Sequence, residues 1–228
     1  MDLLQNMNSF EFMEKGNPPP KDANLFGWLG AEEDSQLLVI PVPWEATTSY
    51  GGGTSDGPDA ILKASPQLDL YTRDLPNHYE KGFHWFDESN DIKALNKMAV
   101  PMAKNVIEAL ERGENLNDAD NTQEAVKKVN EASHQVNQFV YQTSQRLLSE
   151  NKTVGVVGGD HSSPYGLIKA LSEKHDGQFG ILHVDAHLDL RQAYQGFEHS
   201  HASIMYNVMN LKNPPHSLVQ VGIRDFSG

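Results

Sequence analysis

The stretch VGVVGGDH at residues 154–161 and the stretch FGILHVDAHLD at residues 179–189 decide the fold class of this chain. Each begins as a short apolar run and ends in aspartate and histidine. A third apolar run, LVQVGI, occupies residues 218–223. Runs that are apolar throughout are typical of strands buried on both faces of a parallel sheet. The three runs therefore predict parallel strands.

Helices are predicted between and before these strands. Ser162 or Ser163 followed by Pro164 indicates a helix start, and Gly177 indicates its end. Apolar residues at spacings of mostly three, four and seven predict a long helix over residues 121–149.

Further helices are predicted upstream, where Gly57-Pro58 begins one helix and Pro101 begins another that Gly113 ends. The apolar run at residues 37–42 predicts one more strand. Strands that alternate with helices predict an α/β fold, with three αβα layers and a mostly parallel central sheet. We expect a single domain over residues 1–228, in which residues 1–36 form an N-terminal extension.

Composition excludes several functional classes. The 228 residues include 18 Lys+Arg and 31 Asp+Glu, a net charge of −13, which argues against nucleic-acid and anionic-membrane partners. No stretch approaches 18 apolar residues, so no membrane span is predicted. The absence of cysteine excludes disulfides and thiolate metal sites. The start, MDLLQNMNSFEF, does not resemble a secretory signal, and we expect a cytoplasmic location.

Polar residues at two strand ends predict a metal site. Asp185, His187 and Asp189 are spaced by two, so in an extended segment their side chains point to one side. His161 ends the preceding strand, at the sheet edge where ligands bind. An isolated Asp or His at a strand end is usually a cap. Two adjacent carboxylates, however, need a cation to stay ionised together. Oxygen and imidazole ligands without thiolate suit Mn²⁺ best, with Zn²⁺, Fe²⁺ or Co²⁺ as alternatives.

Three motifs resemble those of the ureohydrolase family, which comprises arginases, agmatinases, formiminoglutamases and relatives. They are Gly-Gly-Asp-His at 158–161, Asp-Ala-His-Leu-Asp at 185–189 and Ser-His-Ala-Ser at 200–203. Weaker similarity lies at residues 42–43, 47–49, 57–61 and 221–224. The resemblance covers about residues 37–75 and 150–228. It implies an arginase-like fold, manganese-dependent hydrolysis of a guanidino C–N bond to urea and an amine, and a homo-oligomer, either a trimer or a hexamer.

The resemblance also implies roles for single residues. His161 would bind one Mn²⁺ and His187 the other, Asp185 would bridge them, and Asp189 would bind on the His161 side. Two such ions lower the pKa of the water between them and hold it for attack. His201 matches the residue that delivers a proton to the leaving nitrogen, so His201 and Asp189 are the expected catalytic residues. We expect His183, together with His175 and His199, to be a surface or packing residue.

The chain departs from the family pattern in its last part. The family carries a second carboxylate motif, Asp-x-Asp, on a later strand, and residues 190–228 contain none. We therefore expect a sequence that is cut short at the C-terminal end. Missing strands would leave the apolar faces of Val156, Ile181 and Val221 uncovered.

The substrate side differs from that of arginases. Arg191 stands where arginases carry Asn, and His201-Ala202 replaces the family's His-Gly. Both differences favour a small cationic guanidino substrate, first agmatine, hydrolysed to putrescine and urea. Guanidinobutyrate-like or formiminoglutamate-like substrates are alternatives, because Arg191 could pair with a carboxylate. Arg191 and His201 are thus the predicted substrate-binding residues.

Two other functional classes compete with this interpretation. One is a non-catalytic, ureohydrolase-like protein that binds one metal or none and acts as an assembly subunit. The other is a mononuclear metallohydrolase acting on other C–N bonds, since His161, Asp185 and Asp189 could hold one metal with an open position.

Overall fold

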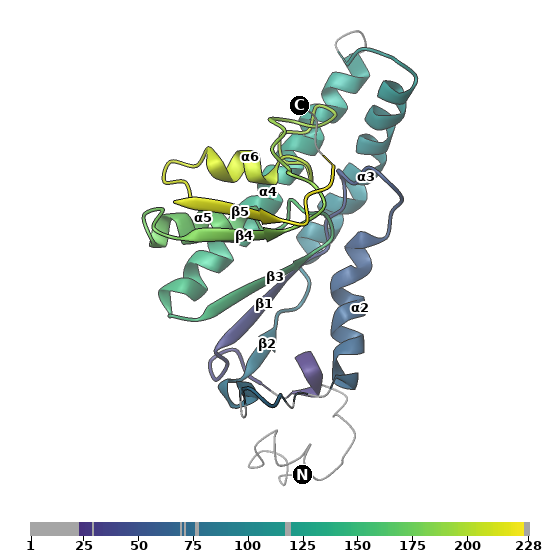
Figure 1. Cartoon of the computed structure of the whole chain (residues 1–228). Coiled ribbons are helices and arrows are strands. Elements are labelled where there is room, and N and C mark those ends of the chain that lie inside the picture. The colour runs from purple at the N-terminus through teal and green to yellow at the C-terminus, as the bar shows by residue number, and fades with distance from the viewer. Residues whose placement is uncertain are drawn as a thin grey trace.

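A computed structural model describes residues 23–28, 30–68, 70, 72–75, 78–116 and 120–225. Its strands are β1 (Leu37–Val42), β2 (Phe83–Trp85), β3 (Thr153–Gly158), β4 (Gly180–Val184) and β5 (Ser217–Val221). They form one sheet of order β2-β1-β3 and a second of order β4-β5 (Figure 1). Every strand pair is parallel, which confirms the predicted strand direction.

The helices are α2 (Gly57–Ala64), α3 (Asn90–Glu111), α4 (Asp120–Ser149), α5 (Tyr165–Lys174) and α6 (Ile204–Met209). Short 3₁₀ turns are η1 (Leu25–Gly27), η2 (Thr54–Asp56), η3 (Ser65–Gln67) and η4 (His78–Lys81). Alternate residues of β1 enter two separate cores. Leu38 and Ile40 pack in the core built with α3 and α4, whereas Val39 packs in the core that includes Leu62 of α2. Helices therefore cover both faces of this sheet, as predicted for three layers.

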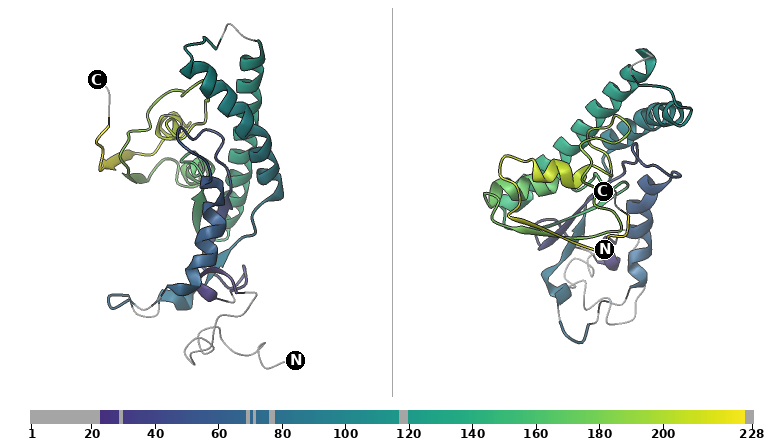
Figure 2. Two further views of the ribbon diagram at one scale, coloured as in Figure 1. Left: turned by 90° about the vertical axis from the view of Figure 1, so that its right-hand side faces the viewer. Right: turned by 45° about the horizontal axis from the view of Figure 1, so that its top comes forward.

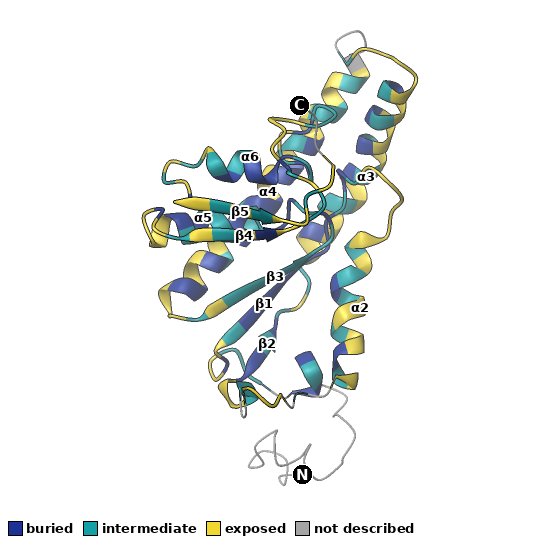
Figure 3. Cartoon of the chain, viewed as in Figure 1, coloured by how far each residue is buried: buried dark blue, intermediate teal, exposed yellow. Residues whose placement is uncertain are grey.

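The β4–β5 sheet is covered on one face only within the described residues. Ile181 and Leu218 pack against Ile204 and the other buried residues of α6. On the opposite face, Leu182, Val184, Val219 and Val221 are all more than half exposed (Figure 3). Of the three residues expected to be uncovered, Val221 is exposed, while Val156 and Ile181 are half-buried. Ile181 is covered by α6, which the sequence did not predict, and Val156 packs against the core built with α3 and α4.

The predicted helix start at Pro101 is wrong. Helix α3 begins at Asn90, where the Ser89 Oγ accepts a hydrogen bond from the Ile92 N–H at 3.4 Å, and Pro101 lies inside it. The buried stripe of α3 includes Ala99 and Ala103, so packing continues through the proline. Pro101 itself is exposed, and its missing N–H therefore faces a side of the helix that water can reach.

Two residues of the expected N-terminal extension, Leu25 and Trp28, are buried against the rest of the chain. Leu25 is 4% exposed and Trp28 is 7% exposed, and the Trp28 and Phe83 rings lie 6.4 Å apart. Residues 1–22 and 29 lie outside the described residues, so the extension and the single domain stay predictions. None of the described helices is both long and apolar enough to cross a membrane.

Gly166 determines how closely α5 approaches α4. Figure 2 shows these helices from two further directions. A Cβ added to Gly166 would lie 2.5 Å from the Asn137 carbonyl oxygen and 2.6 Å from the Tyr141 nitrogen. Backbone atoms cannot yield as a side chain tip can, so only glycine fits this contact.

We expect Gly166→Ala to lower the free energy of unfolding by about 1–3 kcal/mol, the usual cost of overpacking. Gly52→Ala is the control, because its Cβ would meet nothing closer than 3.6 Å and its φ lies outside the left-handed region. At such a position a Gly→Ala change usually stabilises by about 0.4–1 kcal/mol. Urea titrations of both variants measure the difference. Equal stability of the two variants would contradict the close contact.

Candidate functional site

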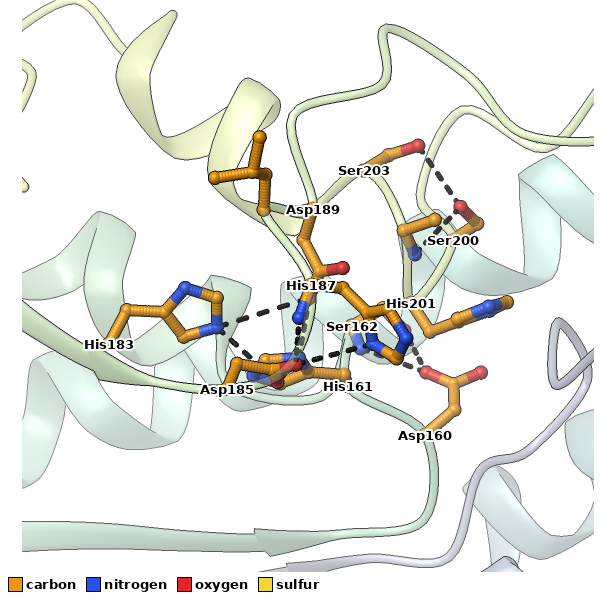
Figure 4. A network of polar contacts seen from close by, with 12 residues as sticks. Asp160, His161, Ser162, His183, Asp185, His187, Asp189, Ser200, His201 and Ser203 are labelled. Atoms are coloured by element: carbon orange, nitrogen blue, oxygen red, sulfur yellow. Dashed lines mark hydrogen bonds and ion pairs between the residues drawn. The ribbon is translucent and has the colours of Figure 1, made fainter. Parts of the chain in front are cut away.

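Four side chains converge where β3 and β4 end. His161 follows β3, His183 lies on β4, and Asp185 and Asp189 follow β4. One ligand atom from each lies within 4.8 Å of all the others (Figure 4). The His161 Nδ1 is 2.8 Å from the Asp189 Oδ2 and 3.3 Å from the Asp185 Oδ2. The structure thus brings together three of the four predicted metal ligands.

The backbone holds Asp189 in a fixed direction. Its φ is 52°, a left-handed conformation that costs a non-glycine residue about 1–2 kcal/mol. The Asp189 carbonyl accepts hydrogen bonds from the N–H groups of Met205 and Tyr206 at 3.0 and 3.2 Å. These bonds come from the start of α6 and compensate for the strain. They leave the carboxylate, which is 6% exposed, directed at His161.

Opposite charges stabilise each other in this group. The hydrogen bond to Asp189 raises the pKa of the His161 imidazole, and the charges of both carboxylates overcome the opposing effect of burial. Burial raises the pKa of the Asp185 carboxyl, but the hydrogen bond from the His187 backbone N–H and the charge of His161 lower it by more, so the net shift is downward. Both shifts favour a charged His161 imidazole beside an ionised Asp185.

His187 lies at the edge of this group. Its Nδ1 is 3.3 Å from the Asp185 Oδ1, its Nε2 is 4.0 Å from the Asp225 Oδ2, and its side chain is 60% exposed. Asp185 thus directs Oδ2 toward His161 and Oδ1 toward His187. A carboxylate can bridge two ions with one oxygen on each side, and this orientation of Asp185 suits its predicted role. The role of His187 as a ligand stays a prediction.

Of the two roles expected for His183, the surface role is wrong and the packing role stays a prediction. Its side chain is 4% exposed, and its Nε2 lies 3.4 Å from the Asp185 Oδ2. A usable signal was present in the sequence. The spacing of two that joins Asp185, His187 and Asp189 extends back to position 183, which places His183 on the same side of the chain.

Asp160 is next to His161 in the same motif, but its carboxylate has a structural role. Its carboxylate is buried and accepts hydrogen bonds from the Thr47 Oγ at 2.9 Å, the Thr47 N–H at 3.3 Å and the Ser162 N–H at 2.9 Å. The Thr47 Oγ in turn accepts the His201 N–H at 3.2 Å. Asp160 therefore ties three loops together. Sequence reasoning missed it, because only the fold brings Thr47 next to position 160.

His201 stands in a cavity beside the acidic group. Its Nε2 is 3.1 Å from the Ser49 Oγ, and its ring meets the Tyr194 ring edge-on at 5.6 Å. The Arg191 guanidinium lies over the same Tyr194 ring, with its Cζ 5.1 Å from the ring centroid. These residues line a cavity of about 550 Å³ together with Asp189, His187 and Asp225. The predicted catalytic and substrate-binding residues therefore share one cavity.

Residues 35–228 match the model of the arginase family. The chain belongs to the arginase family. It is 32% identical over 193 residues to an N(1)-aminopropylagmatine ureohydrolase of Thermus thermophilus, covering 84% of this chain and 52% of that protein. It is 28% identical over 181 residues to the protein of the same name from Synechocystis, covering 79% of this chain and 49% of that protein. The chain thus spans about half the length of these relatives.

Solved structures show the same fold. Agmatine ureohydrolase of Thermoplasma volcanium superimposes with a TM-score of 0.59 at 20% identity, over 87% of this chain and 54% of that one. Formimidoylglutamase of Bacillus subtilis gives a TM-score of 0.55 at 19% identity, over 92% of this chain and 55% of that one. These likenesses confirm the predicted arginase-like fold, and the family match confirms the resemblance that the motifs indicated.

The donor set fits a divalent metal ion. It combines two carboxylates with imidazole and contains no thiolate, the chemistry that hard to intermediate divalent ions prefer. The buried Asp189 carboxylate also needs a positive partner, which a divalent ion would supply.

We expect Asp189→Asn to lower Mn²⁺ affinity by more than about 100-fold, because it removes a charged donor rather than an outer contact. Asp176→Asn, at an exposed residue that also has a positive φ, should leave the affinity unchanged. Isothermal titration calorimetry of the purified protein measures both. An Asp189→Asn affinity equal to that of the control would exclude Asp189 as a ligand.

Proposed function

We propose that the protein hydrolyses a guanidino C–N bond with the help of manganese and releases urea and an amine, with agmatine as the first substrate. The observation that carries this proposal is the group of His161, Asp185 and Asp189 beside a cavity that contains His201. Membership of the arginase family and the names of the relatives support the same chemistry.

His161, Asp185 and Asp189 would hold manganese, and His187 would extend the site to a second ion. Bound divalent metal supplies a nucleophile from water at neutral pH. The chain must then supply a proton to the leaving amine, since an alkylamide anion is a very poor leaving group. His201 is the proposed donor, because it faces the cavity and its Nε2 is within reach of the Ser49 hydroxyl.

Two residues of opposite charge line the cavity, and each would attract a different group at the end of the substrate away from the guanidino group. Asp225, whose side chain is 81% exposed, would attract the ammonium of agmatine. Arg191 would attract a carboxylate. The presence of Arg191 in the cavity favours guanidinobutyrate-like or formiminoglutamate-like compounds as a second class of substrate. A trimeric or hexameric assembly and a cytoplasmic location stay predictions.

The test of the proposed reaction is urea release from agmatine by the manganese-loaded protein. We expect His201→Asn to lower kcat by about 100-fold or more, the usual contribution of a positioned general acid, with manganese content unchanged. His175→Asn, at an exposed residue of the α5 terminus, is the control. Manganese binding without urea release from any guanidino substrate would favour the non-catalytic assembly subunit instead.

A second experiment decides between the substrate classes. We expect Arg191→Gln to lower kcat/KM for 4-guanidinobutyrate by about 10-fold or more, because a charge-assisted hydrogen bond contributes roughly 1.5–3 kcal/mol, and to leave or raise kcat/KM for agmatine. Arg73→Gln, at an exposed arginine that does not line the cavity, controls for net charge. Loss on agmatine alone would contradict the assigned role of Arg191.

A further inference from the structure

His183 is buried beside the metal-binding carboxylates, yet its own hydrogen bonds set it apart from His161. Its Nε2 faces the carboxylates, 3.4 Å from the Asp185 Oδ2 and 4.0 Å from the Asp189 Oδ2 (Figure 4). This nitrogen is shielded from water and has no hydrogen bond among the described residues. Whether it carries a proton therefore decides what His183 can do there.

The contacts of the other ring nitrogen, Nδ1, indicate where the proton of His183 lies. Gln220 lies directly across from His183 in the β4–β5 register. The Gln220 Nε2 is 2.8 Å from the His183 Nδ1 and 2.9 Å from the Leu188 carbonyl oxygen. The nitrogen and oxygen of an amide are told apart by their partners. A carbonyl oxygen only accepts, so the atom beside Leu188 must be the NH₂ group.

The NH₂ group has two hydrogens, one for each of these acceptors. The His183 Nδ1 is therefore an acceptor and carries no proton. A neutral imidazole has one N–H, and in His183 it must be at Nε2, the nitrogen that faces the carboxylates. A nitrogen that carries hydrogen has no lone pair for a metal ion, but it can donate to a carboxylate oxygen.

We propose that Gln220 holds His183 as the Nε2–H tautomer, and that His183 is a positioning residue for the Asp185 and Asp189 carboxylates rather than a metal ligand. This inference rests on the proposed metal site. It separates two histidines that lie 5.2 Å apart between ring centroids. His161 is a ligand, and His183 directs the carboxylate oxygens toward the ion.

The first test reads the tautomer in the metal-free protein. Long-range ¹H–¹⁵N correlation spectra of labelled protein should show the His183 proton on Nε2. Gln220→Glu replaces the donor by a carboxylate, which only accepts, so it should move the proton to Nδ1. Gln178→Glu, at an exposed residue outside the site, should not. A proton on Nδ1 in the unsubstituted protein would overturn the proposal.

The second test separates a donor from a ligand by manganese titration calorimetry. In His183→Gln the side-chain amide can place an N–H near the position of the Nε2–H, whereas His183→Leu removes the donor. We expect affinity within about 3-fold of the unsubstituted protein for Gln, and a loss of about 10–100-fold for Leu, the range found for outer-shell partners. His175→Leu is the control.

The outcomes are distinct. If His183→Gln and His183→Leu lost manganese affinity equally, and by more than the range expected for His183→Leu, His183 would be a ligand. Unchanged manganese affinity in His183→Leu would exclude the positioning role. Both results overturn the proposal. Failure of the proposed function would appear separately, as absence of urea release, because the tautomer is read without metal or substrate.

Discussion

The mutual repulsion of two neighbouring carboxylates, one buried and one half-buried, is the constraint on which this site depends. Asp185 and Asp189 lie close together, and both are largely withdrawn from water. Like charges in such a position must be compensated, or one must take up a proton. The chain surrounds them with the His161 imidazole, the backbone N–H of His187 and the His183 ring. A divalent cation would supply the same compensation with greater charge.

The rest of the architecture keeps this group in place. The ends of β3 and β4 bring the residues to one edge, and the start of α6 holds Asp189 in its strained conformation. Asp160 shows that residue type alone does not define a role. It is also a buried carboxylate, but neutral donors from Thr47 and Ser162 surround it. It therefore organises loops, whereas Asp185 and Asp189 are the proposed ligands of a cation.

Local sequence patterns predicted the long elements well. Helix α4 carries an apolar stripe through many turns, and β1, β3, β4 and β5 are short apolar runs between breakers. Strand β2 and helix α6 were missed because Phe83–Trp85 and Ile204–Met209 are too short to establish a period. The wrong helix start at Pro101 has a related cause, since the buried stripe of α3 outweighs the local preference of proline.

The sequence by itself determined the α/β class, the parallel strands and most of the candidate site, because these depend on residue type at short spacing. Asp185, His187 and Asp189 are two residues apart, and His161 ends a neighbouring apolar run. Only the tertiary structure decided what each side chain faces. Gln220 meets His183 across a strand pair, and Thr47 reaches His201 from a distant loop. These contacts join residues that lie 37 and 154 positions apart in the sequence. Tertiary packing brings such residues together, and no local sequence pattern predicts the contact.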